Sequence, residues 1–135
     1  MVCLHCGHKL QVANSRLQNK SNSVWRRRLC PACKANFTSV ETIDLEKAVI
    51  FERSKKHIEP FKRDKLLISI YEACKHRNDA IDTAKSLTDT IIHKLLPTLR
   101  EPRVTRGDVC TTAQQVLQRF DKAAASAYIA YHPMN

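Results

Sequence analysis

Two pairs of cysteines, each in the form Cys-x-x-Cys, constrain the fold of this chain more than any other feature of its sequence. Cys3 and Cys6 form the first pair and Cys30 and Cys33 the second, with 23 residues between the pairs. Each pair can form a turn whose two sulfurs converge on one ion, and four sulfurs complete a closed tetrahedral shell around Zn²⁺. The spacing therefore predicts a structural zinc site, because no coordination position is left for a substrate.

Two alternatives to this site are weaker. A pair of redox-active motifs is disfavoured because no βαβ pattern surrounds either one. His5 and His8 could replace a cysteine ligand, but four thiolates already satisfy the ion. A segment of about 40 residues buries too little apolar surface to fold alone, whereas structural zinc contributes an apparent ~10–16 kcal/mol to small domains. We therefore expect a metal-centred zinc ribbon over residues 1–42.

Charge divides the chain at the same region. Residues 1–40 hold seven Lys or Arg and no Asp or Glu, whereas the remaining residues hold 16 basic side chains and all 13 acidic ones. An acid-free basic segment attracts a polyanion such as nucleic acid. No apolar run precedes the first cysteines, and no segment approaches the ~18 apolar residues of a membrane span. We expect a cytoplasmic chain with no membrane partner.

The pattern of short and long apolar segments predicts an α+β fold. Residues 10–17 and 23–29 read as a hairpin, residues 37–40 as a third strand, and residues 48–51 as a strand followed by a basic loop and a return strand. Helical periodicity then predicts about four helices: residues 64–76 with Asp64 as cap, residues 80–96 ended by Pro97, one beginning at a weak capping box of Thr105 and Asp108, and residues 121–131. The second domain is expected over residues 43–135.

The sequence contains no recognisable catalytic constellation. It has only two glycines, no phosphate-binding P-loop, no nucleophile elbow and no HExxH motif. Cys74 and Cys110 fall on apolar helical stripes and are interpreted as buried small side chains. A regulatory disulfide between them has no support in the sequence. We do not expect an enzyme.

Several motifs together resemble the NrdR family of bacterial transcriptional repressors. The matching stretches are Cys3-x-x-Cys6-Gly7, residues 12–16 (VANSR), residues 25–30 (WRRRLC), Cys33, residues 37–41 (FTSVE), residues 59–67 (EPFKRDKLL) and Val104-Thr105 onward. The resemblance covers essentially the whole chain. It implies a zinc ribbon that binds double-stranded operator DNA of ribonucleotide reductase genes. It also implies an ATP-cone domain that binds ATP or dATP and sets a homo-oligomeric state, in a protein that works at the bacterial nucleoid.

One departure from the family lies in the cone. The family's Val-x-Lys-Arg-(Asp/Asn)-Gly motif is replaced here by residues 52–57 (ERSKKH). Lys56 occupies the glycine position, and a lysine there loses the easy access to positive φ that glycine has. By this resemblance, the residues expected to contact nucleotide phosphates are Arg53, Lys55, Lys56 and Lys65. The alternative is a cone that has lost its nucleotide and serves assembly only.

The run Arg26-Arg27-Arg28 is the expected DNA contact. Side chains alternate along a strand, so Arg26 and Arg28 share one face while Trp25 and Arg27 take the other. We expect Arg26 and Arg28 to divide between base edges and phosphates, and Arg27 and Arg16 to contact the backbone. Trp25 is expected to pack against the hairpin and not to intercalate. The alternative function is a protein-interaction module, which the absence of acid in the first 40 residues disfavours.

Overall fold

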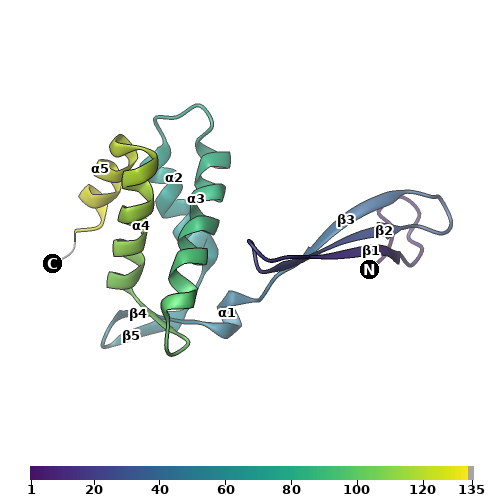
Figure 1. The fold of residues 1–135 in the computed structure, drawn as a ribbon, viewed down its shortest axis with the longest axis horizontal. Helices are drawn as coiled ribbons and strands as arrows, with labels where there is room; N and C mark the ends of the chain where they lie inside the picture. Colours follow the sequence, from purple (N-terminus) through teal and green to yellow (C-terminus); the bar gives the residue numbers. More distant parts are fainter. Residues whose placement is uncertain (134–135) are drawn as a thin grey trace. The chain divides into compact units, whose positions relative to one another are not determined.

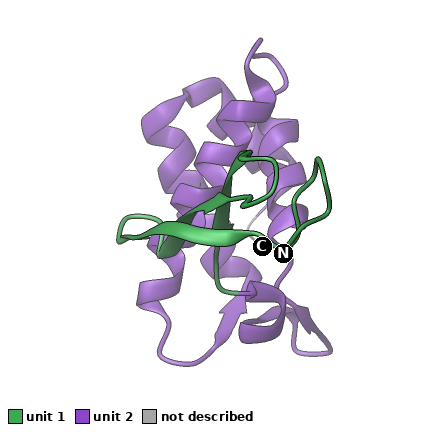
Figure 2. Ribbon diagram, turned by 90° about the vertical axis from the view of Figure 1, so that its right-hand side faces the viewer, with its two compact units in different colours: residues 1–43 green, residues 44–135 purple. Residues whose placement is uncertain are grey.

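The computed structural model describes residues 1–133 and separates into two compact units. The first unit spans Met1–Ile43 and the second spans Asp44–Asn135 (Figure 2). This division lies close to Glu41, the first acidic residue in the sequence, and one residue past the boundary expected from composition. Charge and packing therefore change at nearly the same point of the chain.

Three antiparallel strands in the order β1-β2-β3 make up the sheet of the first unit (Figure 1). They are β1 (Gln11–Gln18), β2 (Ser23–Leu29) and β3 (Asn36–Glu41). Asn22, in the turn between β1 and β2, has a positive φ of 45°, which asparagine tolerates better than most residues. The hairpin and the third strand expected from the sequence are confirmed.

The strand register divides the side chains of this sheet between two faces. Trp25 lies opposite Arg16 on β1 and opposite Val40 on β3, so these three share one face. The next residue along β2, Arg26, points to the other face. The expected alternation of the arginine run between the two faces is thus confirmed.

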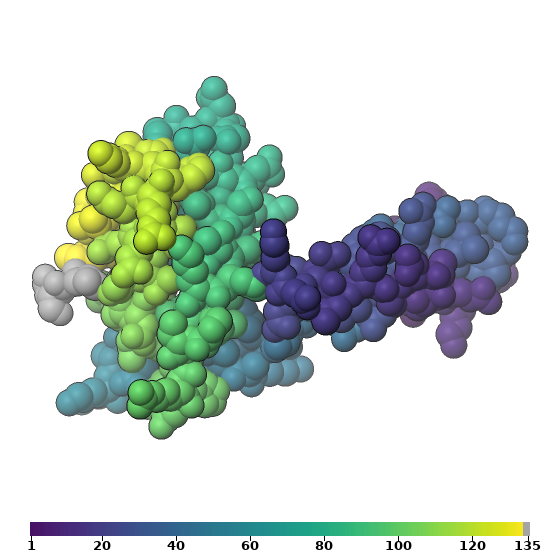
Figure 3. Space-filling model, viewed as in Figure 1, coloured from purple at the N-terminus to yellow at the C-terminus, as the bar shows by residue number. Residues whose placement is uncertain are grey.

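The core of the first unit is small. Cys3, Leu10 and Cys30 are buried, and Ala35 and Phe37 pack against them. Every side chain of β1 is exposed, and the space-filling view shows residues 1–43 as a narrow body (Figure 3). So few buried apolar groups cannot offset the conformational entropy of some 40 residues, and a bound metal is needed to stabilise this unit.

The second unit packs helices against a small three-stranded sheet (Figure 1). Its helices are α1 (Leu45–Ala48), α2 (Arg63–Cys74), α3 (Ala80–Leu95), α4 (Arg106–Phe120) and α5 (Lys122–Tyr131), with a 3-10 turn η1 (Leu96–Thr98) after α3. Its strands are β4 (Ile50–Ser54), β5 (His57–Pro60) and β6 (Arg103–Thr105). Strand β4 is central, antiparallel to β5 and parallel to β6. The fold is α+β, as expected.

The four long helices expected from the sequence are present, with shifted ends. Helix α2 begins after Lys62, so the expectation that Asp64 caps it was wrong. Asp64 lies instead in the first turn, where a negative charge interacts favourably with the positive end of the helix. At the other end the helix stops at Cys74, two residues before the expected end. Pro97 lies in η1, just beyond the end of α3.

The sequence prediction missed two elements of the second unit. Ala48, assigned to a strand, belongs to the short helix α1, and β4 begins only at Ile50. Strand β6 has three residues and pairs with β4 from a distant part of the sequence, so no local pattern reveals it. Its parallel pairing brings the start of α4 beside β4.

A single apolar core holds the second unit together. Its fully buried large side chains come from all four long helices and from β6: Ile70, Ile91, Leu95, Val104, Leu117 and Tyr128. Figure 1 shows these helices side by side, with the sheet at one end of the bundle. Among residues 1–133, no helix is long and apolar enough to cross a membrane.

A capping box fixes the start of α4. The Thr105 side chain accepts a hydrogen bond from the Asp108 amide at 3.1 Å, and the Asp108 carboxylate accepts one from the Thr105 amide at 2.9 Å. The capping box expected from the sequence is confirmed. It holds the first turn of α4 in place, and that turn lines the cavity described below.

Candidate functional site

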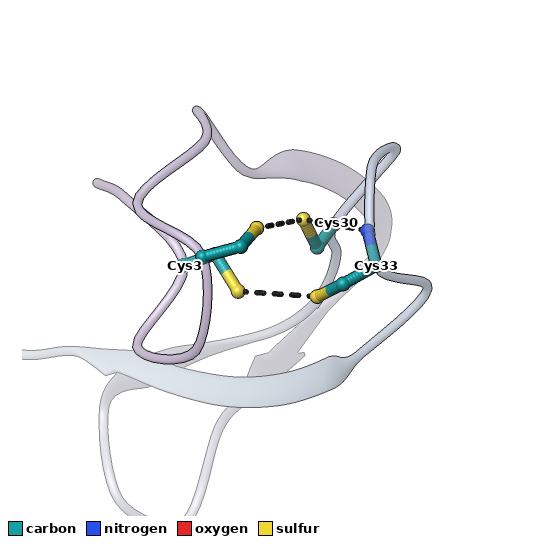
Figure 4. Close-up of side chains that lie close together, drawn as sticks. Cys3, Cys30 and Cys33 are labelled. Carbon is teal, nitrogen blue, oxygen red and sulfur yellow. Dashed lines mark hydrogen bonds between the residues drawn. The ribbon is translucent and has the colours of Figure 1, made fainter.

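The four cysteines of the first unit converge on one point. The Sγ atoms of Cys3 and Cys33 lie 3.5 Å apart, those of Cys6 and Cys30 lie 3.4 Å apart, and all four lie within 4.8 Å of one another. Figure 4 shows Cys30 and Cys33 approaching Cys3 from a separate loop. A tetrahedron with Zn–S bonds of about 2.3 Å has S···S edges of about 3.8 Å. The donor set therefore fits a Zn²⁺ ion, and the four predicted ligands are brought together.

Each cysteine pair lies in a turn of the same form. The residue that follows the second cysteine has positive φ in both turns: Gly7 at 75° and Lys34 at 63°. The amide of each also donates to the carbonyl of the first cysteine of its pair, at 3.0 Å in both cases. Two equivalent knuckles thus present their sulfurs from opposite sides of the site.

Backbone amides stabilise the thiolate form that binds metal. The amide of Cys33 lies 3.5 Å from the Cys30 Sγ, and the amide of His5 lies 3.4 Å from the Cys3 Sγ. The first of these contacts holds the pKa of the Cys30 thiol down to about 6, against the opposing effect of desolvation. The histidine alternative gains no support, since the His5 ring stacks near Phe37, with centroids 5.4 Å apart.

The expected DNA-contacting arginines divide between the two faces of the sheet and differ in their partners. Arg26 donates to a carboxylate oxygen of Glu41 at 2.7 Å, and Arg28 donates to the Ser39 hydroxyl at 2.8 Å. Arg16 and Arg27 are exposed and have no side-chain partner among the described residues. Sequence reasoning missed the Glu41 pairing because it searched for acids only within residues 1–40.

The second unit contains a cavity of about 380 Å³, which lies in the range of roughly 300–1,000 Å³ typical of ligand pockets. Its cationic lining residues are Arg53, Lys62, Lys65 and Arg106. Two of them, Arg53 and Lys65, were expected from the sequence, whereas Lys62 and Arg106 were missed. The other two expected contacts, Lys55 and Lys56, lie in the turn between β4 and β5 and are not among the lining residues. Their role stays a prediction.

Two helix N-termini contribute to the positive potential of this cavity. Lys62 and Lys65 come from the start of α2, and Arg106 is the first residue of α4. Unpaired amide groups and the helix dipole make such ends favourable for phosphate. Lys65 is paired with Glu59 at 2.7 Å, and this contact, the largest cause, lowers the pKa of the Glu59 carboxyl. Glu59 also lines the cavity, so the lining holds four cations and one carboxylate and keeps a net positive charge, which suits an anion.

The other lining residues of the cavity are aromatic, aliphatic or neutral polar, apart from Glu59. Ser69 and His132 are joined by a hydrogen bond of 2.6 Å, and the Tyr128 hydroxyl donates to the Cys110 Sγ at 4.0 Å. Burial and, after it, the nearby Arg106 charge lower the pKa of His132, which favours the neutral form of its ring. Burial also raises the pKa of Tyr128. These residues offer neutral hydrogen-bonding groups and rings in the same cavity as the cations.

Cys74 and Cys110 are buried and free, which confirms their interpretation as buried side chains. Cys74 belongs to the apolar core and does not line the cavity. Cys110 lies at the cavity wall, a position that its apolar helical stripe did not reveal.

Comparisons with known proteins agree with both units. Residues 1–41 match the family described as "Transcriptional repressor NrdR-like, N-terminal domain", and residues 51–133 match the "ATP cone domain". A curated relative from Maricaulis maris (strain MCS10), described as "Transcriptional repressor NrdR", is 34% identical, covering 98% of this chain and 84% of that protein. A second with the same description, from Symbiobacterium thermophilum, is 32% identical, covering 100% and 91%.

The fold and the matching families define a class: a transcriptional regulator, not an enzyme, that joins a zinc ribbon to an ATP-cone domain. Within that class the chain belongs to the NrdR family of transcriptional repressors.

Proposed function

We propose that this chain represses ribonucleotide reductase genes by binding their operator DNA through its zinc ribbon, under the control of ATP or dATP bound in the cavity of the cone. The observation that supports the regulatory part is the cavity itself, whose lining includes four cations and the first turns of two helices. The gene target rests on the family resemblance. The site of action is the cytoplasm, at the nucleoid.

Charge supports double-stranded DNA as the ligand of the ribbon. Residues 1–40 have seven basic and no acidic side chains, and four ionised cysteines around Zn²⁺ still leave a positive unit. Affinity for DNA derives largely from neutralising phosphates, which suits such a segment. Zinc has no chemical step to perform here, since a four-cysteine shell leaves no open position; it holds the knuckles and the sheet in place.

The chemistry of the cavity supports an adenine nucleotide. A triphosphate would lie against Arg53, Lys62, Lys65 and Arg106, and the nucleoside against the neutral wall formed by Ser69, Tyr128 and His132. Of the residues expected from the sequence, Arg53 and Lys65 are the stronger phosphate contacts. Lys55 and Lys56 are proposed as secondary contacts because they lie in the turn that follows β4.

The nucleotide must bind two states of the protein with different affinity in order to regulate it. We propose that these states are homo-oligomers of different size, because the cavity and the ribbon lie in separate units. A change in the number of linked ribbons would alter DNA affinity through effective concentration, without any change within one ribbon.

The deciding experiment is a gel-shift titration with duplex DNA from the promoter of the organism's own ribonucleotide reductase genes. Protein without nucleotide, with ATP and with dATP is compared, and a scrambled duplex of equal length is the control. Promoter-specific binding that differs between the three samples supports the proposal. Specific binding without any nucleotide effect, together with no calorimetric heat at millimolar nucleotide, would indicate a cone that serves assembly only. Absence of DNA binding in all samples would favour the protein-interaction module.

A further inference from the structure

The two faces of the ribbon sheet differ in how far their side chains are already engaged. We define the open face by Asn14, Arg16, Trp25, Arg27, Thr38 and Val40, which the strand register sets side by side. The opposite, covered face contains Arg26, Arg28, Phe37, Ser39 and Glu41 on β2 and β3, and the exposed Val12, Ser15 and Leu17 on β1. The two faces hold equal numbers of arginines, so charge count alone does not distinguish them.

Intramolecular contacts engage the β2 and β3 side chains of the covered face. Arg26 is paired with Glu41 and Arg28 with Ser39, and both hydrogen bonds link β2 to β3. Phe37 packs against the buried cysteine cluster. On β2 and β3, both arginines, Phe37 and Ser39 are only partly exposed. The functional groups of this face therefore hold the ribbon together.

The polar side chains of the open face are exposed and make no side-chain contacts of this kind within residues 1–133. Arg27, Thr38 and Val40 are exposed, as are Asn14 and Arg16 on β1. Neither arginine has an ion pair or a side-chain hydrogen bond within residues 1–133. No Asp or Glu points to this face, whereas the covered face contains Glu41. The positive charge of Arg16 and Arg27 is therefore not neutralised by an acidic side chain on the same face.

The residue types of the open face match what a DNA groove presents. Arginine binds phosphates and the O6 and N7 atoms of guanine, asparagine pairs with adenine, and threonine and apolar side chains contact the thymine methyl group. Trp25, half-buried between Arg16 and Val40, supplies a rigid apolar surface between the cations. A two-dimensional array of this kind can contact phosphates and base edges together.

We propose that the open face is the surface that meets duplex DNA, with Arg16 and Arg27 in direct contact with it. Arg26 and Arg28 are positioning residues, which join β2 to β3 and keep the open face in register. The sequence led us to expect all four arginines on the DNA, with Arg26 and Arg28 divided between base edges and phosphates; this assignment keeps only the contacts of Arg16 and Arg27. It rests on the proposed function, because it assumes that the ribbon binds DNA.

The test compares two double variants of the full chain with equal loss of charge: Arg16→Gln/Arg27→Gln and Arg26→Gln/Arg28→Gln. Binding to the promoter duplex is measured over a series of salt concentrations, and zinc content is measured for each protein. The open-face variant should lose roughly 100-fold or more in affinity at low salt. Its log–log salt slope should fall by about 1.8, since each phosphate contact contributes about 0.9. The covered-face variant should keep most of the slope.

A further variant keeps the test decisive if the Arg26→Gln/Arg28→Gln protein does not fold. Glu41→Gln breaks the pair with Arg26 and leaves every arginine in place, and Asp44→Asn, three residues on, is its charge-matched control. If Arg26 bound DNA in competition with Glu41, Glu41→Gln would raise affinity well above the control. Equal affinities in the two variants support the proposal.

The outcomes separate this inference from the proposed function. The open-face proposal is wrong if the covered-face variant loses more of the salt slope, or if Glu41→Gln binds DNA more tightly than Asp44→Asn. Either result leaves the proposed repressor function intact. Equal slope losses in the two double variants overturn the open-face proposal as well. No binding by the unaltered protein removes the proposed function, and the inference with it.

Discussion

The Nε2 of His76 lies 2.8 Å from Oδ2 of Asp121, and this contact joins the loop after α2 to the start of α5. Asp121 is the N-cap of α5, where its other oxygen accepts from the amides of Ala123 and Ala124. Arg77 donates to the same carboxylate at 3.4 Å. One carboxylate thus links the loop between α2 and α3 to the junction between α4 and α5.

These contacts predict acid lability of the second unit. The hydrogen bond from His76, the largest cause, lowers the pKa of Asp121 from 3.8 to about 2. A carboxylate with a depressed pKa stabilises the folded state above its unfolded pKa, and this contribution is lost as pH falls from about 4 towards 2. In Asp121→Asn, the free energy of unfolding should drop at pH 7 and the drop should shrink as the pH approaches 2. Chemical denaturation across this pH range measures it.

The matched control is Asp82→Asn, which removes a carboxylate in the first turn of α3 that has no ion pair within residues 1–133. Because Asn remains a good N-cap, Asp121→Ala should destabilise more than Asp121→Asn. If Asp121→Asn lowers the free energy of unfolding by the same amount at every pH, the charge of Asp121 does not contribute to these contacts.

Removal of one metal ligand should separate the two units. Cys30→Ser is expected to lose the single zinc ion per chain and to unfold the first unit, because that unit has only a small apolar core. The second unit has its own core and should keep its helical circular dichroism. Elemental analysis and circular dichroism measure the two effects. Cys74→Ala, in the core of the second unit, is the control and should retain zinc. Full zinc content in Cys30→Ser would contradict the four-cysteine site.

The metal site was predictable from sequence because its information is local. Two short motifs fix where four sulfurs can meet, whatever the rest of the chain does. The long helices were predictable for the same reason, since apolar periodicity repeats every few residues. Strand β6 depends instead on pairing with a distant strand, and Glu41 binds Arg26 across the sheet. Neither relation has a local signature.

The residues that line the cavity were likewise predictable from the sequence only in part. Arg53 and Lys65 were expected through their alignment with a family motif, whereas Lys62 and Arg106 belong to no motif used. Their signal was positional: each lies at the first residues of a helix, and the Thr105 capping box already marked one of these starts. A search for cations at helix N-termini would have found both.

Nucleotide binding should depend on the cavity cations more than on the β4–β5 turn. Lys65→Ala and Arg106→Ala should each weaken ATP or dATP binding about 10- to 100-fold, the loss of one charge-assisted contact. Lys55→Ala/Lys56→Ala should weaken it less, since neither side chain lines the cavity. Isothermal calorimetry measures the three affinities. Lys75→Ala is the control, as Lys75 pairs with Glu72 outside the cavity lining. A larger loss in the turn variant would restore the assignment made from sequence.

The last prediction concerns a buried hydroxyl. Thr88 on α3 is fully buried, and its Oγ1 has no hydrogen-bond partner among the described residues. An unsatisfied buried polar group destabilises the folded state, and valine has nearly the same shape. Thr88→Val should therefore raise the free energy of unfolding of the second unit by about 1 kcal/mol, measured by urea denaturation.

Thr83, also buried on α3, is the matched control for this substitution. Its hydroxyl hydrogen-bonds to Asp79 and contributes to the lowered pKa of that carboxyl, after the larger effect of Arg77. Thr83→Val leaves this carboxylate without one of its donors, so it should lower the free energy of unfolding. The two substitutions are chemically identical and should have opposite signs. Destabilisation by both would show that the Thr88 hydroxyl has a partner in solution, such as a bound water molecule.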